Sequence, residues 1–181
     1  MTIIAAVRWK GAIVMGADSA GTADYQLTIR QDPKAFIVGP YVMGFTWSFR
    51  MGQLLAHGFK PPAPPRRGRD LERFMVVDFV DSVRALLKGA GWARVTNGQE
   101  EGGVFLVGVG GRLFRVEADY QVGEARDDYD AVGSGADVAR GALFAGRSFK
   151  PEHRIRLALR AAERHNAGCR GPFRLLTGGR R

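Results

Sequence analysis

The chain has 181 residues, 45% of them hydrophobic, which is enough for one well-filled core but not for two, so we expect a single domain over residues 2–181. Its formal charge of +9 comes from 22 arginines and 5 lysines that are scattered along the chain without a nucleic-acid-binding motif, so the composition does not favour a nucleic-acid partner. With no long apolar run, no secretory leader and one cysteine, the sequence predicts a cytoplasmic protein with no membrane span, no internal disulfide and no cysteine-built metal site.

The sequence predicts a strand that begins directly behind the initiator methionine. An alternating, β-branched run covers residues 2–8, meets a turn at Gly11 and returns over residues 12–18, which is typical of a hairpin. Short strand-like runs follow at residues 25–30, 34–38 and 41–45, the last two joined by Gly39 and Pro40. This succession favours an antiparallel sheet with several short members.

Two helices are expected next. Residues 48–59 carry apolar side chains at helical spacing, and the segment 57–69, with four prolines, ends that pattern in a loop. Asp70 can cap a second helix that ends at Gly89. Its apolar face consists of Leu71, Phe74, Met75, Phe79, Val83, Leu86 and Leu87, with Asp78 as the one polar member.

Strand patterns return in the second half of the chain. Two runs flank a glycine turn within residues 102–122, and a third covers residues 129–135. Helices are expected over residues 136–146 and 151–168, and a last strand over residues 171–179. Two antiparallel sheets could cover one face each by packing together, with a helix pair outside each. The order predicts an α+β fold, a four-layer αββα sandwich, although other α+β arrangements remain open.

Thr2 is the candidate for chemistry, because the sequence contains no serine-hydrolase elbow, zinc-protease helix or phosphate-binding loop. A small second residue permits removal of Met1, after which Thr2 would carry both a hydroxyl and a free amine. An α-amino group has a pKa of about 7.7 to 8.0 and can therefore accept the hydroxyl proton as a general base. Such a catalyst must sit on a rigid element, which explains a strand that begins at residue 2.

The first segment, MTIIAAVRWKGAIVMGADSAG, resembles the start of proteasome β subunits and of the bacterial HslV peptidase. The resemblance continues at KAFIVGPYVMGF and YDAVGSGADVARGAL and in the last helix and strand, so it covers most of the chain in the right order. The proteasome-type N-terminal nucleophile hydrolases have an αββα sandwich. The resemblance therefore implies the same fold as the order of elements.

The resemblance also implies a set of site residues. Thr2 matches the nucleophile of these enzymes, Asp18 the aspartate that orients a lysine, Lys34 that lysine, and Ser134 a serine near the threonine amine. Taken singly, Thr2, Asp18 and Ser134 are also ordinary strand or turn residues. A lysine in an apolar run is more informative here, because this chain otherwise prefers arginine and a lysine offers a compact, tunable ammonium.

The chain departs from the pattern of these enzymes at three positions. Trp47 falls, with one position of alignment uncertainty, where they have an oxyanion-hole glycine; a backbone N–H could still act there, but the indole could crowd a substrate or serve as a core or subunit contact. Asn166 and Cys169 match an aspartate and a serine in the last helix, so one supporting carboxylate is missing. We expect Cys169 to be a small buried residue rather than a catalytic thiol.

The resemblance predicts a threonine-type endopeptidase that hydrolyses peptides or unfolded proteins and needs no metal or organic cofactor. It also implies a homo-oligomeric ring, and it leaves room for a separate ATPase that unfolds substrates. Two alternatives remain open at this stage. The fold could serve as a weakly active or inactive assembly module, which Trp47 and Asn166 favour, or as a non-peptide amidohydrolase with the same nucleophile.

Overall fold

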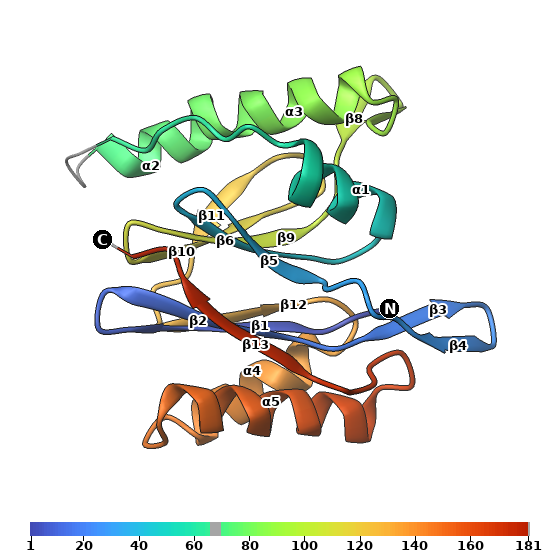
Figure 1. Ribbon diagram of the computed structural model, residues 1–181, viewed down its shortest axis with the longest axis vertical. Coiled ribbons are helices and arrows are strands. Elements are labelled where there is room, and N and C mark those ends of the chain that lie inside the picture. The colour runs from blue at the N-terminus through green and yellow to red at the C-terminus, as the bar shows by residue number, and fades with distance from the viewer. Residues whose placement is uncertain (66–69, 181) are drawn as a thin grey trace.

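Two antiparallel sheets lie face to face between two helical layers in the computed structural model, which describes residues 1–65 and 70–180 (Figure 1). This arrangement confirms the predicted αββα sandwich of the α+β class. The predicted loop over residues 57–69 begins two residues later than expected, because His57 and Gly58 belong to the π-helical turn Leu54–Gly58. Residues 59–65 contain no helix or strand, and residues 66–69 lie outside the described residues.

The four-stranded sheet is built around the first hairpin, and its strand order is β12-β1-β2-β13. Its strands are β1 (Ile4–Trp9), β2 (Ala12–Ala17), β12 (Tyr129–Val132) and β13 (Arg174–Gly178), all paired antiparallel. Lys10 and Gly11 form the predicted turn of the hairpin, with φ angles of 49° and 74°. A two-residue type I′ turn requires positive φ at both central residues, and its twist matches that of the two flanking strands.

The five-stranded sheet has the order β11-β10-β9-β6-β5. Its strands are β5 (Ala35–Val38), β6 (Tyr41–Phe45), β9 (Phe105–Val109), β10 (Arg112–Val116) and β11 (Val122–Glu124). The expected run at residues 25–30 does not join either large sheet, because β4 (Gln26–Ile29) pairs with β3 (Ala20–Ala23). A second separate hairpin, β7 (Arg94–Thr96) and β8 (Gln99–Glu101), was not predicted.

The helices lie outside the sheets as the sequence predicts. The outer layer of the five-stranded sheet contains α1 (Phe49–Gln53), a π-helical turn Leu54–Gly58, α2 (Leu71–Phe74), a π-helical turn Met75–Phe79 and α3 (Val80–Gly89). The outer layer of the four-stranded sheet contains α4 (Ala136–Ala145) and α5 (Pro151–His165). Among the described residues, no helix combines the length and the apolar character that a bilayer span requires.

Two details of the helix over residues 70–89 differ from the prediction. Asp70 precedes the helix but its side chain makes no capping hydrogen bond. Asp78 is exposed instead of lying on the buried face, because the π-helical turn Met75–Phe79 widens the helix and brings Phe79 and Val80 to the core. The apolar face is otherwise fully used in packing against the sheet.

The first strand is buried on both faces, because successive side chains of a strand point in opposite directions. Ile4 and Ala6 pack between the two sheets, whereas Ile3, Ala5 and Val7 pack against the layer of α4 and α5. Thr2 therefore lies directly before a segment, Ile3 to Ala6, that is completely buried.

Candidate active site

The first hairpin brings Thr2 and Asp18 together. Ile4 pairs with Ala17, so the residues just before β1 and just after β2 are neighbours. The Ile3 N–H donates to Asp18 Oδ1 at 3.1 Å, and the Asp18 N–H donates to the Ile3 carbonyl at 3.2 Å. Thr2 is itself buried, with 5% of its surface exposed. The strand begins at Ile4 and not at residue 2 as predicted, and Thr2 is fixed just before it by these backbone contacts.

Lys34 reaches this pair from the other sheet, where it directly precedes β5. Its Nζ donates to Thr2 Oγ1 at 2.7 Å and to Asp18 Oδ1 at 2.8 Å, and only 1% of the residue is exposed. Burial lowers the pKa of Lys34, and the charge of the Asp18 carboxylate opposes that shift. The ammonium stabilises negative charge on the threonine oxygen, which makes the hydroxyl easier to deprotonate.

Asp18 is held by several donors at once. Besides Ile3 and Lys34, the backbone N–H groups of Ala20 and Arg170 each donate to its Oδ2 at 3.2 Å. A buried carboxylate with this many donors is held in one orientation. It can therefore fix the position of the lysine.

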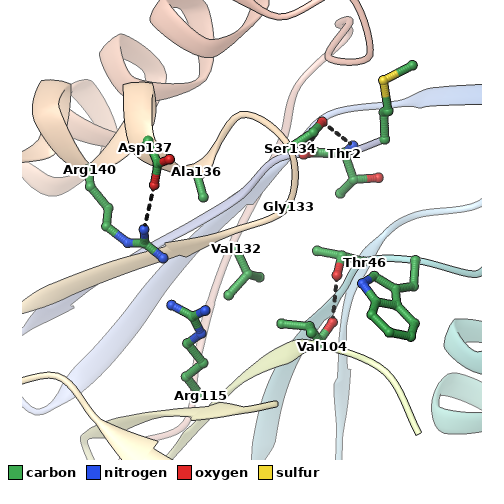
Figure 2. Close-up of a pocket in the computed structure, with 12 residues that line it drawn as sticks. Thr2, Thr46, Val104, Arg115, Val132, Gly133, Ser134, Ala136, Asp137 and Arg140 are labelled. Carbon is green, nitrogen blue, oxygen red and sulfur yellow. Dashed lines mark hydrogen bonds and ion pairs between the residues drawn. The ribbon is translucent and has the colours of Figure 1, made fainter. Parts of the chain in front are cut away.

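Ser134 lies on the other side of Thr2, in the turn between β12 and α4. The Thr2 N–H donates to Ser134 Oγ at 3.2 Å, and this hydroxyl donates to Asn166 Oδ1 at 3.1 Å (Figure 2 shows the first contact). Asn166, at the end of α5, donates in turn to the Ser134 carbonyl at 2.8 Å. The amide of Asn166 thus contacts Ser134, at the position where the sequence resemblance implies a carboxylate.

Cys169 is buried behind this group, and its Sγ lies 3.5 Å from Asn166 Oδ1. Burial raises the pKa of the Cys169 thiol to about 11. A protonated, inaccessible thiol is a weak nucleophile. The structure therefore gives Cys169 the surroundings of a packing residue, as expected from the sequence.

A pocket of about 380 Å³ opens beside Thr2 (Figure 2). Trp47 also lines it, with 62% of its surface exposed and a φ of 70°. That left-handed conformation is one that glycine adopts without strain. Within the described residues, the Trp47 N–H has no hydrogen-bond acceptor. The tryptophan thus keeps a glycine-like backbone at the edge of the pocket.

Met1 occupies part of the same pocket, and its ammonium donates to Thr22 Oγ1 at 3.3 Å. While Met1 is attached, the Thr2 nitrogen belongs to a peptide bond and is not basic. Gly168 lies against Met1, since a Cβ at that position would come within 2.0 Å of the methionine Cβ. Removal of Met1 would leave open space next to the Thr2 nitrogen.

Some residues of the site were not predicted. Gly133 has a φ of 107°, and a Cβ there would lie 2.2 Å from the Thr2 carbonyl oxygen, so only glycine fits beside the threonine. Its place in a glycine-rich turn was the available signal. Arg115 lines the pocket from β10. The sequence could have indicated it, because a charged residue shares a strand face with the apolar Leu113. Among the described residues, no three His, Cys, Asp or Glu side chains are grouped to hold a metal ion.

Neither a known sequence-family profile nor a curated protein matches the chain by sequence. Several solved structures nevertheless resemble it. BPH from Thiobacillus denitrificans, solved in complex with epoxomicin, has a TM-score of 0.80 and 23% identity over 97% of both chains. HslV from Trypanosoma brucei has a TM-score of 0.70 and 18% identity, over 97% of this chain and 98% of that one. Anbu, an ancestral beta-subunit from Yersinia bercovieri, has a TM-score of 0.69 and 13% identity, over 98% and 81%. The chain has the fold of the proteasome-like N-terminal nucleophile hydrolases.

Proposed function

We propose that the protein is a threonine-type peptidase whose nucleophile is the Thr2 hydroxyl after removal of Met1. One observation carries this proposal: the buried Lys34 ammonium contacts Thr2 Oγ1 and Asp18 Oδ1 simultaneously. A buried ammonium between a hydroxyl and a carboxylate is expensive to desolvate, so a purely structural role would be better served by apolar side chains. The arrangement is suited to lowering the pKa of a nucleophile.

In the proposed reaction, the free Thr2 amine accepts the hydroxyl proton and Oγ1 attacks the carbonyl carbon of the scissile amide. The tetrahedral intermediate collapses when the amine returns the proton to the leaving nitrogen, which leaves an ester on Thr2. A water molecule, deprotonated by the same amine, then hydrolyses the ester. Ser134 would orient the amine, and Asp18 would hold Lys34.

The backbone N–H of Trp47 is the proposed donor to the oxyanion. It lies at the edge of the pocket that contains Thr2 and has no acceptor among the described residues. A free, fixed N–H of this kind stabilises the negative charge that develops on the carbonyl oxygen. The indole itself would then border the bound substrate.

We propose peptides or unfolded proteins as substrates and a homo-oligomeric ring in the cytoplasm as the working form, with a separate ATPase as a possible partner. The resemblance to HslV and Anbu supports the assembly. The proposed reaction requires only groups of the protein and water. Asn166 would support Ser134 through its amide, because it accepts from the serine hydroxyl and donates to the serine carbonyl.

The test begins with the intact mass of untagged protein, which should correspond to a chain that starts at Thr2. A peptide epoxyketone, chosen because BPH was solved with epoxomicin, should then add once to the protein, and peptide mapping should place it on Thr2. Thr2→Ala is the matched control, since alanine keeps a small second residue and so permits Met1 removal. It should neither react nor cleave a peptide library.

The outcomes separate the three functions. Labelling together with peptide cleavage supports the peptidase, and labelling without cleavage of any peptide favours a non-peptide amidohydrolase. Neither labelling nor cleavage by protein that has lost Met1 favours an inactive assembly module. Full activity of protein that retains Met1 would refute the proposed mechanism.

A further inference from the structure

Arg115 occupies an unusual place for a charged residue. Side chains of β10 alternate between its faces, and Leu113, two residues earlier, packs in the core between the two sheets. Arg115 therefore points towards the four-stranded sheet, near the end of β12, and Figure 2 shows its guanidinium directed into the pocket below Val132. A cation is held at the edge of the apolar layer, inside the pocket that also contains Thr2.

The pocket has a second arginine, but its hydrogen-bonding groups are already used. Arg140 donates through Nε to Asp130 at 3.0 Å, through Nη1 to Asp137 at 2.9 Å and through Nη2 to the Ala131 carbonyl at 2.7 Å. Asp137, the acidic residue of the lining, is therefore paired as well. Arg140 serves to hold the turn between β12 and α4.

Arg115 is different, because its nitrogens are mostly unused. Its Nε lies 2.6 Å from Glu117 Oε1, which places a carboxylate on one edge of the guanidinium. Within residues 1–65 and 70–180, neither Nη nitrogen has a hydrogen-bond acceptor. The free edge presents two parallel donors, a geometry that matches the two oxygens of a carboxylate. Partial removal from water strengthens such a contact.

We infer that this pocket binds a carboxylate of the substrate and that Arg115 determines this specificity. The inference rests on the proposed function and names the substrate class of the same site: peptides with an acidic group next to the cleaved bond. The carboxylate has two possible sources, an acidic side chain or the free end of a peptide. A hydrogen bond to a charged group contributes about 1.5 to 3 kcal/mol, which corresponds to about 10- to 100-fold in specificity.

The experiment uses the mature protein and peptides that it cleaves. Glu and Gln are exchanged in turn at the three positions on either side of the cleaved bond, in peptides with an amidated C-terminus. A Gln peptide with a free C-terminal carboxylate next to the site forms the second arm. For the wild type, kcat/KM should be at least tenfold higher for the Glu peptide than for the Gln peptide at one of these positions, or at least tenfold higher for the free C-terminus than for the amidated one.

Arg115→Met should abolish this preference, so that kcat/KM for the peptides with the carboxylate falls at least tenfold relative to that for their neutral counterparts. Arg115→Lys should retain part of the preference, and it also serves as the test if Arg115→Met does not fold. Arg156→Met, an exposed arginine on α5, is the matched control and should behave like the wild type. Melting temperatures establish that the variants are folded.

Equal cleavage of Glu and Gln peptides and of both C-termini by the wild type would overturn the inference. So would a carboxylate preference that persists in Arg115→Met. In both cases epoxyketone labelling of Thr2 would leave the proposed function intact. Protein that shows neither labelling nor cleavage would refute the proposed function, and the inference with it.

Discussion

Lys34 lies between two oxygens at hydrogen-bond distance and has almost no contact with water. We predict that Lys34→Arg reduces kcat/KM by at least about 100-fold, or about 2.7 kcal/mol of transition-state stabilisation, although the charge is kept. A planar guanidinium is larger than an ammonium and would displace either the hydroxyl or the carboxylate. Kinetics on a peptide that the wild type cleaves provides the measurement.

Lys88→Arg is the control for this substitution, because Lys88 is an exposed residue of α3 and its replacement should change neither activity nor melting temperature. The melting temperature of Lys34→Arg should also stay close to that of the wild type. Near-normal turnover by Lys34→Arg would mean that Lys34 is a structural ion-pair partner and that the assignment of the site is wrong.

Cys169 leads to a prediction about pH. Since burial raises the pKa of its thiol to about 11, the thiolate fraction at pH 8 is about one in a thousand, and it increases only as the pH approaches that value. Iodoacetamide at pH 8 should therefore modify the unfolded chain quickly and the native protein hardly at all, as followed by intact mass. Rapid modification of native protein with loss of activity would instead indicate a reactive thiol at the site.

The resemblance to proteasome-type enzymes was informative about residues that lie at the spacing usual in those enzymes. Thr2, Asp18 and Lys34 were predicted together, and the structure brings them into contact. Arg115 and Gly133 were not predicted, because their importance comes from contacts between the two sheets or with the Thr2 carbonyl. Such contacts depend on how the sheets pack, which the pattern along one strand does not specify.

At the level of whole elements, the π-helical turn Met75–Phe79 leads to a prediction about Asp78 that differs from the one for a regular helix. Asp78 is exposed, whereas Phe79 is fully buried against Tyr41 and Phe59. Asp78→Ala should change the free energy of unfolding by less than about 0.5 kcal/mol. Phe79→Ala should cost about 3 to 5 kcal/mol, because it leaves a cavity. Urea unfolding of both variants measures the two values.

A large loss of stability in Asp78→Ala would mean that this side chain faces the core, as the regular helical spacing predicted. The example shows why the prediction was wrong there. Spacing rules assume a constant number of residues per turn, and the wide turn after Met75 places Val80 instead of Asp78 on the buried face, while Val83 and Leu87 are buried as predicted. The hairpin β7–β8 was missed for a different reason, since its Asn97-Gly98 turn signal lies between strands of only three residues each.

The whole molecule carries exposed apolar side chains that its own core does not use. The apolar face from Leu71 to Leu87 is buried against the five-stranded sheet and so gives no support to self-association. Tyr25, Leu27 and Ile29 are instead exposed on and beside β4, in a hairpin that projects from the sandwich (Figure 1). Exposed apolar groups of this kind mark contact surfaces.

We predict a closed homo-oligomer by light scattering at micromolar concentration. Combined Tyr25→Asp and Leu27→Asp substitutions should shift it towards smaller species, because charges would be buried in the contact. The control combines Val76→Asp and Val77→Asp, because both valines are exposed apolar residues of the outer helical layer. A wild-type monomer would argue against the ring and for an amidohydrolase that works alone.

Thr2, the proposed nucleophile, lies just before β1, which runs inside its sheet between β12 and β2 and is buried on both faces. Amide hydrogens in such a strand exchange with solvent only when the whole molecule opens, whereas hairpins at the margin exchange through local opening. The amides of Ile4 to Val7 should therefore be among the slowest to take up deuterium. Heating or denaturant should consequently leave activity undiminished until the molecule unfolds as a unit, so that catalytic loss and global unfolding share one midpoint.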